Sequence, residues 1–198
     1  MATLLVHGIW GDAAQLDPLK RGLERHGVRP LRALTFEPND GRARIEELGA
    51  QIGREVDGLR ASDGAVDLVG FSMGALASRW YVQRGGGKGA VRRFISISGP
   101  HNGTLTAHAL GFAGVRQMRP GSDLLKDLAS DDDPWGQVEV HALYTPFDLM
   151  IVPAVSSLLP GARSTHKVPA LLHRFMLSDQ RVHAIVAKLL AGSVEAPA

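Results

Sequence analysis

Residues 66–75 read Val66-Asp67-Leu68-Val69-Gly70-Phe71-Ser72-Met73-Gly74-Ala75 and pass from an apolar run into a turn of small residues. The run is typical of a buried strand, and the residues that follow are typical of a helix. The central five residues match G-x-S-x-G, the pattern of a sharp strand-to-helix turn that lifts a serine hydroxyl above a sheet. We therefore predict that Ser72 is a nucleophile, flanked by glycines because larger side chains would collide there.

Short apolar runs alternate with helical patterns along the rest of the chain. Strands are expected at residues 4–6, 30–36, 66–71, 91–98, 138–144 and 163–168, and helices at 12–26, 45–59, 73–83 and 178–189. Unbroken apolar strands that alternate with helices indicate a parallel sheet covered on both faces. The predicted class is α/β, with a mostly parallel central sheet of about six strands.

The length of 198 residues suits one domain that spans residues 1–198. Residues 99–136 fit the alternation poorly. A long insertion at one end of a sheet often builds a substrate pocket, so residues 101–135 are expected to form either a small pocket or lid insertion or a plain loop. The acidic run at 131–133 is expected to be a solvated turn rather than a cation site.

The loop after the first strand is the second candidate for chemistry. His7-Gly8-Ile9-Trp10-Gly11 follows Leu4-Leu5-Val6, and its glycines allow backbone N–H groups to turn inward. Acyl transfer needs two such donors for the developing oxyanion. We predict that these are the N–H groups of Ile9 and Met73. Trp10 is expected to shape the pocket, and His7 to brace the loop rather than to take part in catalysis.

A serine nucleophile also needs a histidine base and a carboxylate that orients it. Asp148 follows the expected strand at 138–144 and is predicted to be this acid. Two histidines follow it at a useful distance. His166 lies within the last expected strand, whereas His173 lies in a loop beyond it, so His173 is the preferred base and His166 the alternative.

The remaining assignments concern the pocket and the other histidines. Phe71 and His101 are expected to line the pocket. Phe112, Met118 and Trp135 suit the pocket or the core equally well. His183 is expected at the surface, and the other histidines are expected to be structural: His26, His108 and His141.

Composition excludes several classes of protein. The chain has no cysteine, which rules out disulfides and thiolate zinc sites, and its net charge of +2 shows no nucleic-acid footprint. No apolar stretch approaches the roughly 20 residues of a membrane span. The first residues lack a signal-peptide pattern, so a cytoplasmic location is expected unless the sequence is a processed form. We find no metal ligand set, and the sequence does not indicate an oligomeric state.

Taken together, the chain resembles the small single-domain bacterial lipases and esterases of the α/β-hydrolase superfamily, which include triacylglycerol lipases. The resemblance rests on residues 6–9, 70–74 and 148–173, in the family's order. It implies a minimal α/β-hydrolase fold and a triad of Ser72, Asp148 and His173. It also implies hydrolysis of carboxylic esters, often lipid esters, without a cofactor. The alternatives are a thioesterase, amidase or acyltransferase with the same triad, or a non-catalytic binding protein.

Overall fold

The computed structural model describes residues 1–192, apart from the side chains of residues 62 and 63. One sheet holds six strands in the order β2-β1-β3-β4-β5-β6, and every neighbouring pair is parallel. The expected parallel sheet is therefore confirmed. Its strands are β1 (Thr3–Val6), β2 (Leu31–Leu34), β3 (Val66–Phe71), β4 (Val91–Ile97), β5 (Glu139–Tyr144) and β6 (Ser164–Lys167).

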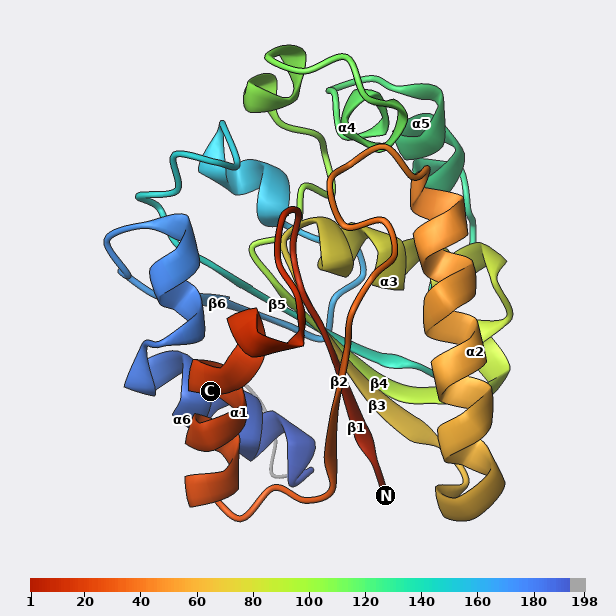
Figure 1. Ribbon diagram of the computed structural model, residues 1–198, viewed down its shortest axis with the longest axis vertical. Coiled ribbons are helices and arrows are strands. Elements are labelled where there is room, and N and C mark those ends of the chain that lie inside the picture. The colour runs from red at the N-terminus through yellow and green to blue at the C-terminus, as the bar shows by residue number, and fades with distance from the viewer. Residues whose placement is uncertain (193–198) are drawn as a thin grey trace.

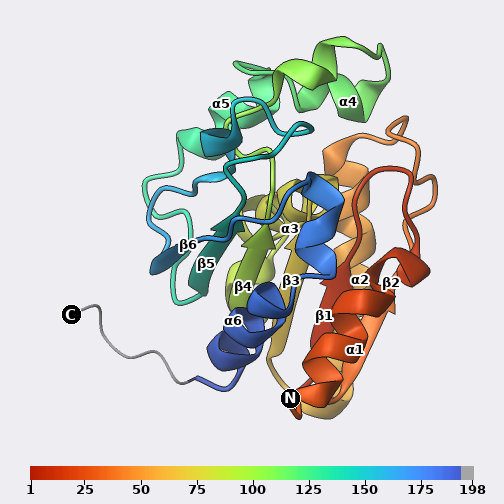
Figure 2. The same ribbon diagram turned by 90° about the vertical axis from the view of Figure 1, so that its left-hand side faces the viewer.

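Helices cover both faces of the sheet (Figures 1 and 2). Helices α2 (Ile45–Asp63) and α3 (Met73–Arg84) cover one face, and α1 (Asp17–Arg25) and α6 (Gln180–Leu190) cover the other. Strand β1 shows how the sequence builds both cores. Leu4 and Val6 belong to the apolar cluster beneath α2 and α3, whereas Leu5 belongs to the cluster beneath α1 and α6, because successive side chains on a strand point to opposite faces.

The connections beyond the carboxyl ends of the strands are long and carry short helices. The β4–β5 connection contains η3 (Leu105–His108), α4 (Ala113–Gln117) and α5 (Asp123–Ala129), which lie above the sheet in both views. Further one-turn helices are η1 (Ala13–Leu16), η2 (Gly87–Gly89), η4 (Ala154–Ser157) and η5 (His173–Leu177). Because parallel strands end at a common edge, the connections that follow the strands gather around one end of the sheet. Only η2, which directly precedes β4, lies at the other end among the short helices of the described chain.

A buried arginine ties the β4–β5 connection to α3. The guanidinium of Arg79 donates to the carbonyl oxygens of His101 and Leu128, both at 2.9 Å, and to Oε1 of Gln83 at 2.7 Å. Burial lowers the pKa of Arg79 to about 10, which leaves it protonated at neutral pH. The helix that follows Ser72 therefore holds both ends of the segment 101–128.

The acidic turn at 131–133 differs from expectation at one residue, Asp131, whereas Asp132 and Asp133 are exposed as expected. The carboxylate of Asp131 accepts from Arg84 at 2.7 Å and from Lys88 at 3.2 Å. Both cations lie at the end of α3 or just after it. Asp131 is thus an ion-paired anchor for the connection rather than a solvated side chain.

Three further expectations need correction. The pattern at 12–26 is a one-turn helix, η1, that runs into α1, and the strand expected at 30–36 covers only Leu31–Leu34. His183 is buried rather than exposed, and its Nε2 lies 2.8 Å from the carbonyl oxygen of Leu177. The cause is the close crossing of α1 and α6, where a side chain on Gly22 would overlap the His183 ring. Within residues 1–192, none of the helices has the length and apolar content needed to cross a bilayer.

Candidate active site

Ser72 lies at the tight turn between β3 and α3. Its backbone has a positive φ of 55° with ψ −126°, a sparsely populated conformation that costs energy in a residue with a side chain. Its N–H donates to the carbonyl oxygen of Ile97 at 2.9 Å. The flanking glycines are sterically required: a Cβ on Gly70 would lie 2.7 Å from the Cα of Ala75, and one on Gly74 would overlap the His7 carbonyl. The expected collision at these positions is confirmed.

In the loop after β1, the N–H group of Ile9 is not used by another group of the described chain. The N–H of Gly8 donates to Oε1 of Gln15 at 3.0 Å, that of Trp10 to the carbonyl oxygen of Asn39 at 2.7 Å, and that of Gly11 to that of Gly8 at 3.2 Å. Among the described residues, the N–H of Ile9 has no acceptor. Met73 is the first residue of α3, where a helix leaves its N–H groups without an intrahelical acceptor.

His7 braces this loop from beneath, as expected. Its Nε2 accepts from the N–H of Phe36 at 2.9 Å, and Nδ1 lies 2.6 Å from the carbonyl oxygen of Gly8. Because Nε2 accepts, Nδ1 carries the proton and donates to Gly8. Burial lowers the pKa of His7, which maintains this neutral form.

Asp148 and His173 meet beyond the ends of β5 and β6. Nδ1 of His173 lies 2.7 Å from Oδ2 of Asp148. The other oxygen, Oδ1, accepts from the N–H groups of Met150 at 2.9 Å and Ile151 at 2.8 Å. The carboxylate is therefore fixed by the backbone on one side and free to accept from the imidazole on the other.

The second nitrogen of His173 faces no partner. Nε2 is buried and makes no hydrogen bond within residues 1–192, so it is not bonded to Ser72 Oγ in this structure. An ionised carboxylate only accepts, so Nδ1 carries the proton and Nε2 presents its lone pair. The hydrogen bond between a catalytic base and its nucleophile is often long in the absence of substrate, and it tightens when substrate binds.

His166, the alternative base, lies elsewhere. Its Nε2 is 2.8 Å from Oγ of Ser164, and the same hydroxyl is 2.8 Å from Nδ1 of His141. These three side chains form a cluster across β5 and β6. Of the two candidate bases, only His173 contacts Asp148.

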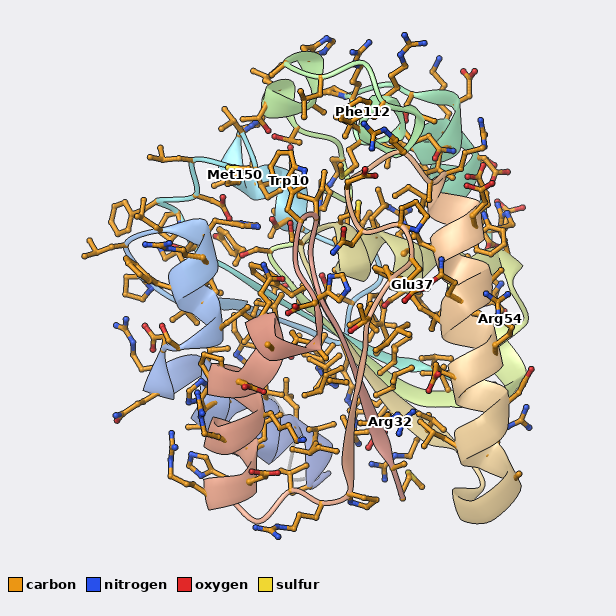
Figure 3. All side chains as sticks on the ribbon, viewed as in Figure 1. Trp10, Arg32, Glu37, Arg54, Phe112 and Met150 are labelled. Carbon is orange, nitrogen blue, oxygen red and sulfur yellow. The ribbon has the colours of Figure 1, made fainter. Side chains whose placement is uncertain are left out.

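An apolar cavity of about 190 Å³ opens beside Ser72. Its walls come from the loop after β1, the β4–β5 connection and the segment after Asp148. Ser72 and two residues of the first loop, Ile9 and Trp10, line it; the others are Thr104, Thr106, Ala107, Ala109, Leu110, Val115, Met118, Met150 and Ile151. Residues 104–118 of the expected pocket insertion thus contribute most of the wall. Figure 3 shows Trp10 and Met150 next to each other at this end of the molecule.

Two residues expected to line the pocket lie outside it. Phe71 points to the face of the sheet that α1 and α6 cover. There its ring packs against that of His173, with centroids 4.7 Å apart. The reason is strand alternation in β3. His101 turns into the core, where its Nε2 lies 2.6 Å from Oγ of Ser96. Burial lowers the pKa of His101 well below its usual value, with a smaller effect from the charge of Arg79.

The three hydrophobic residues that suited the pocket and the core equally well differ in their positions. Met118 lines the cavity. Trp135 is in the core, where its ring centroid is 6.2 Å from that of Phe94. Phe112, in the β4–β5 connection, is half-buried beneath the guanidinium of Arg42. It lies at a distance from Trp10 in Figure 3.

Several residues at the site have no signature in the sequence. Gln15 and Asn39 hold the loop after β1, and Thr104 joins the cavity wall to the segment after Asp148 through Met150. Ser98 follows β4 with φ 50° and a buried hydroxyl that lacks a partner among the described residues. Trp10, Ser72 and Ser98, which follow β1, β3 and β4, are the non-glycine residues with positive φ in the described chain.

Comparison with known proteins identifies the fold and the family of the chain. A gene product of Listeria innocua has a TM-score of 0.74 and 18% identity over 98% of this chain and 95% of its own. Aspergillus fumigatus lipase B has a TM-score of 0.83 and 16% identity, over 99% of this chain but 53% of its own. Mature Bacillus licheniformis lipase BlEst2 has a TM-score of 0.77 and 16% identity, over 96% and 91%.

Because these identities are low, the structural likeness shows the fold alone, which is the α/β-hydrolase fold of these lipases. No curated protein sequence matches the chain significantly. A family model described as palmitoyl protein thioesterase matches residues 3–157. This range covers most of the chain, from β1 past Asp148, and the protein therefore belongs to the palmitoyl protein thioesterase family.

Proposed function

We propose that the protein is a serine hydrolase that cleaves carboxylic esters or thioesters of fatty acids through Ser72, His173 and Asp148. One observation carries the proposal. The His173 ring contacts Asp148 through Nδ1 at 2.7 Å and has its other nitrogen buried and unpaired. A strained serine lies beside the apolar cavity at the same end of the sheet. This is the distribution of roles that nucleophilic acyl transfer needs.

In the proposed acylation step, Ser72 Oγ attacks the substrate carbonyl carbon as His173 Nε2 takes the hydroxyl proton. The carbonyl oxygen becomes an oxyanion that accepts from the N–H groups of Ile9 and Met73. The unused state of the Ile9 N–H supports this role, because a donor that awaits the oxyanion needs no rearrangement. Asp148 accepts from Nδ1–H and stabilises the imidazolium.

The tetrahedral intermediate then collapses. The bond to the leaving group breaks, His173 Nε2–H protonates the departing oxygen or sulfur, and the acyl group remains on Ser72. Water attacks this acyl-enzyme with His173 again as the base. Collapse of the second intermediate releases the fatty acid and returns the proton to Ser72 Oγ.

The leaving group distinguishes two candidate activities. The family match favours a thioester, and a thiol with a pKa near 8.5 leaves more easily than an alcohol. The cavity suits the acyl part of either substrate. At about 190 Å³ it is below the roughly 300–1,000 Å³ of usual ligand pockets, so it encloses only the part of a long acyl chain nearest the carbonyl.

Covalent labelling tests the nucleophile. We expect a fluorophosphonate probe to label the wild-type protein and to leave Ser72→Ala unlabelled. Ser78→Ala is a control, because Ser78 lies on the same helix, with its hydroxyl bonded to the Gly74 carbonyl oxygen at 2.7 Å. Continued labelling of Ser72→Ala at another residue would refute the assignment.

A substrate panel separates the activities. It compares p-nitrophenyl esters, acyl-CoA thioesters, an S-palmitoylated peptide and fatty-acid amides, each with wild type and Ser72→Ala. Hydrolysis of esters or thioesters that depends on Ser72 supports the proposal, and the ratio of their kcat/KM values identifies the preferred leaving group. Inertness toward the whole panel together with no labelling would favour a binding protein.

A further inference from the structure

The exposed apolar side chains of this protein are concentrated at one end. Eleven large apolar residues are exposed among those described, and all except Met1 lie in connections beyond the carboxyl ends of the strands. The most exposed are Leu171 at 74%, Leu149 at 69% and Trp10 at 58%. We call this surface the apolar rim; it comprises Trp10, Leu105 and the exposed apolar side chains of segments 147–158 and 171–175. Such a concentration marks an interaction surface.

Backbone hydrogen bonds hold the rim open. The N–H of Leu105 donates to the carbonyl oxygen of Val152 at 2.9 Å, and that of Asn102 to Ser156 at 2.9 Å. The hydroxyl of Thr104 donates to the Met150 carbonyl oxygen at 2.8 Å. The two segments are thus joined by main-chain groups and by the Thr104 hydroxyl. The exposed apolar side chains of these segments are therefore carried by a backbone that is held in place.

Basic side chains outnumber acidic ones in the two segments that carry most of the rim. Segments 99–122 and 149–178 contain no aspartate or glutamate, although the whole chain has 20 acidic residues. They contain five arginines and lysines: Arg116, Arg119, Arg163, Lys167 and Arg174. Arg163 directly precedes β6 and therefore lies at the amino end of the strands, away from the rim, which leaves four cations on this side. Of the five, only Arg163 pairs with a carboxylate in the described chain. Asp148, between the two segments, is buried and bound to His173. Two further acidic residues adjoin the rim: Asp12 follows Trp10 by two residues, and Asp179 is paired with Arg181.

Apolar contact and positive charge together indicate the occupant. A second copy of the chain would bring like charges together, which disfavours self-association. An anionic lipid surface offers apolar depth and negative headgroups without requiring directional bonds. Trp10 and Met150 both belong to the rim and line the cavity, so a lipid surface against the rim would meet the cavity mouth.

We propose that the apolar rim inserts into the headgroup region of anionic bilayers and turns the cavity mouth toward the lipid. Delivery of acyl chains from the bilayer to Ser72 rests on the function proposed above. Adsorption to the bilayer does not, since it depends on rim residues alone.

The test uses full-length Ser72→Ala protein, in which hydrolysis cannot alter the vesicles. Co-sedimentation with phosphatidylcholine vesicles that contain 30% phosphatidylglycerol is compared with sedimentation on pure phosphatidylcholine. We expect stronger binding to the anionic vesicles. Adding Leu149→Ser and Leu171→Ser should lower the partition coefficient by about tenfold or more, because two large exposed apolar side chains are lost. Arg174→Glu should lower it roughly fivefold or more on anionic vesicles.

The matched charge control is Arg25→Glu, an exposed arginine in the last turn of α1, which leads to the amino end of β2. It should leave partitioning unchanged. In protein that keeps Ser72, the double variant Leu149→Ser/Leu171→Ser should retain the wild-type circular dichroism spectrum and should still hydrolyse a short soluble ester. This result would show that the variant is folded.

Three outcomes would overturn the proposal. The protein stays in the supernatant with anionic vesicles, or the double variant partitions as well as its parent, or the parent is a dimer that the double variant dissociates without any vesicle binding. The last outcome would make the rim an interface between copies. If the wild-type protein binds vesicles but hydrolyses no substrate and is not labelled by fluorophosphonate, the proposal of membrane binding is supported and the proposed hydrolase function is refuted.

Discussion

The backbone of Gly8 lies so close to Ser72 that a Cβ on Gly8 would be 2.9 Å from the Cβ of Ser72 and 3.3 Å from its Oγ. Gly8→Ala must therefore push the loop that carries Ile9 away from the nucleophile. Displacement of a reacting group by about 1 Å costs on the order of 100-fold in rate. We expect Gly8→Ala to lower kcat/KM for a short ester by about this factor, measured by steady-state kinetics.

Gly58→Ala is the matched control. Gly58 lies in α2, and a Cβ there would meet nothing within 4 Å. This change should leave kcat/KM intact and raise the unfolding free energy by about 0.5–1 kcal/mol, because alanine favours the helix. Activity of Gly8→Ala within twofold of wild type would contradict the close approach.

Gln15 should act on catalysis through Gly8. Its Oε1 accepts the Gly8 N–H at 3.0 Å, so Gln15→Ala releases the loop that holds Ile9. We expect kcat to fall about tenfold, within the range of a single supporting contact, with little change in KM. Gln15→Glu retains an acceptor oxygen and should recover most of kcat. An equal loss in both variants would show that Gln15 acts in some other way.

Asp148→Asn should preserve the fold but reverse the imidazole. The amide oxygen can still accept from Met150 and Ile151, whereas its NH₂ group cannot accept from His173 Nδ1–H. The proton then moves to Nε2, which loses its capacity as a base, and we expect kcat to fall by about 10⁴-fold. The control is Asp123→Asn on the surface of α5, which should have wild-type kinetics. A loss below tenfold in Asp148→Asn would separate Asp148 from catalysis.

Ser98→Gly should stabilise the protein. Ser98 combines φ 50° with a buried hydroxyl that lacks a partner within residues 1–192. Left-handed backbone costs about 1–2 kcal/mol in a non-glycine residue, and an unsatisfied buried hydroxyl costs about 1–3 kcal/mol. Glycine loses about 0.5–1 kcal/mol through its greater entropy when unfolded. The net expectation is a gain of about 1 kcal/mol or more in chemical denaturation, and a lower stability would refute it.

Acid should destabilise the fold through buried histidines. Burial lowers the pKa of His141 to about 4, with a further effect from Arg93. Between this value and the unfolded pKa near 6.5, the unfolded state binds more protons. The unfolding free energy therefore falls as pH falls from about 6.5 to 4, by at most about 1.4 kcal/mol per pH unit for each such group.

Denaturation midpoints at pH 7, 6 and 5 would measure this slope. His141→Leu removes the titrating group and should flatten the slope, and the exposed His26→Leu serves as the control. An unchanged slope in His141→Leu would assign the acid sensitivity to other groups, such as His7 and His101, whose pKa values burial also lowers.

The sequence predicts the local features of the site best. The turn at Ser72 is encoded within a few residues, because strand, glycines and helix follow one another directly. The position of Asp148 follows from the end of β5, and the preference for His173 follows because a loop can carry a ring further than a strand can. These inferences rest on strand order and parallel pairing, which apolar patterning predicts well.

Features that depend on packing between distant segments could not be predicted. Phe71 directly precedes Ser72, and His101 follows the neighbouring strand β4. The side chains of both nevertheless point away from the cavity. His183 is buried because α1 crosses α6 at Gly22, more than 150 residues away along the chain. The support that Gln15 and Asn39 give to the first loop comes from polar side chains without any periodic pattern.

Most of the bonds that join the segments around residues 102–106 and 150–158 end on main-chain carbonyl groups; the exception is the Val152 N–H, which donates to Oγ1 of Thr104 at 2.9 Å. A carbonyl group is present whatever the side chain, so Leu105, Val155 and Leu158 can be replaced without loosening the scaffold that holds Asp148. Divergence among homologues could thus alter the outer surface one residue at a time while the chemistry remains intact. This separation makes the outer surface an evolvable part of the molecule and a suitable place to begin directed evolution.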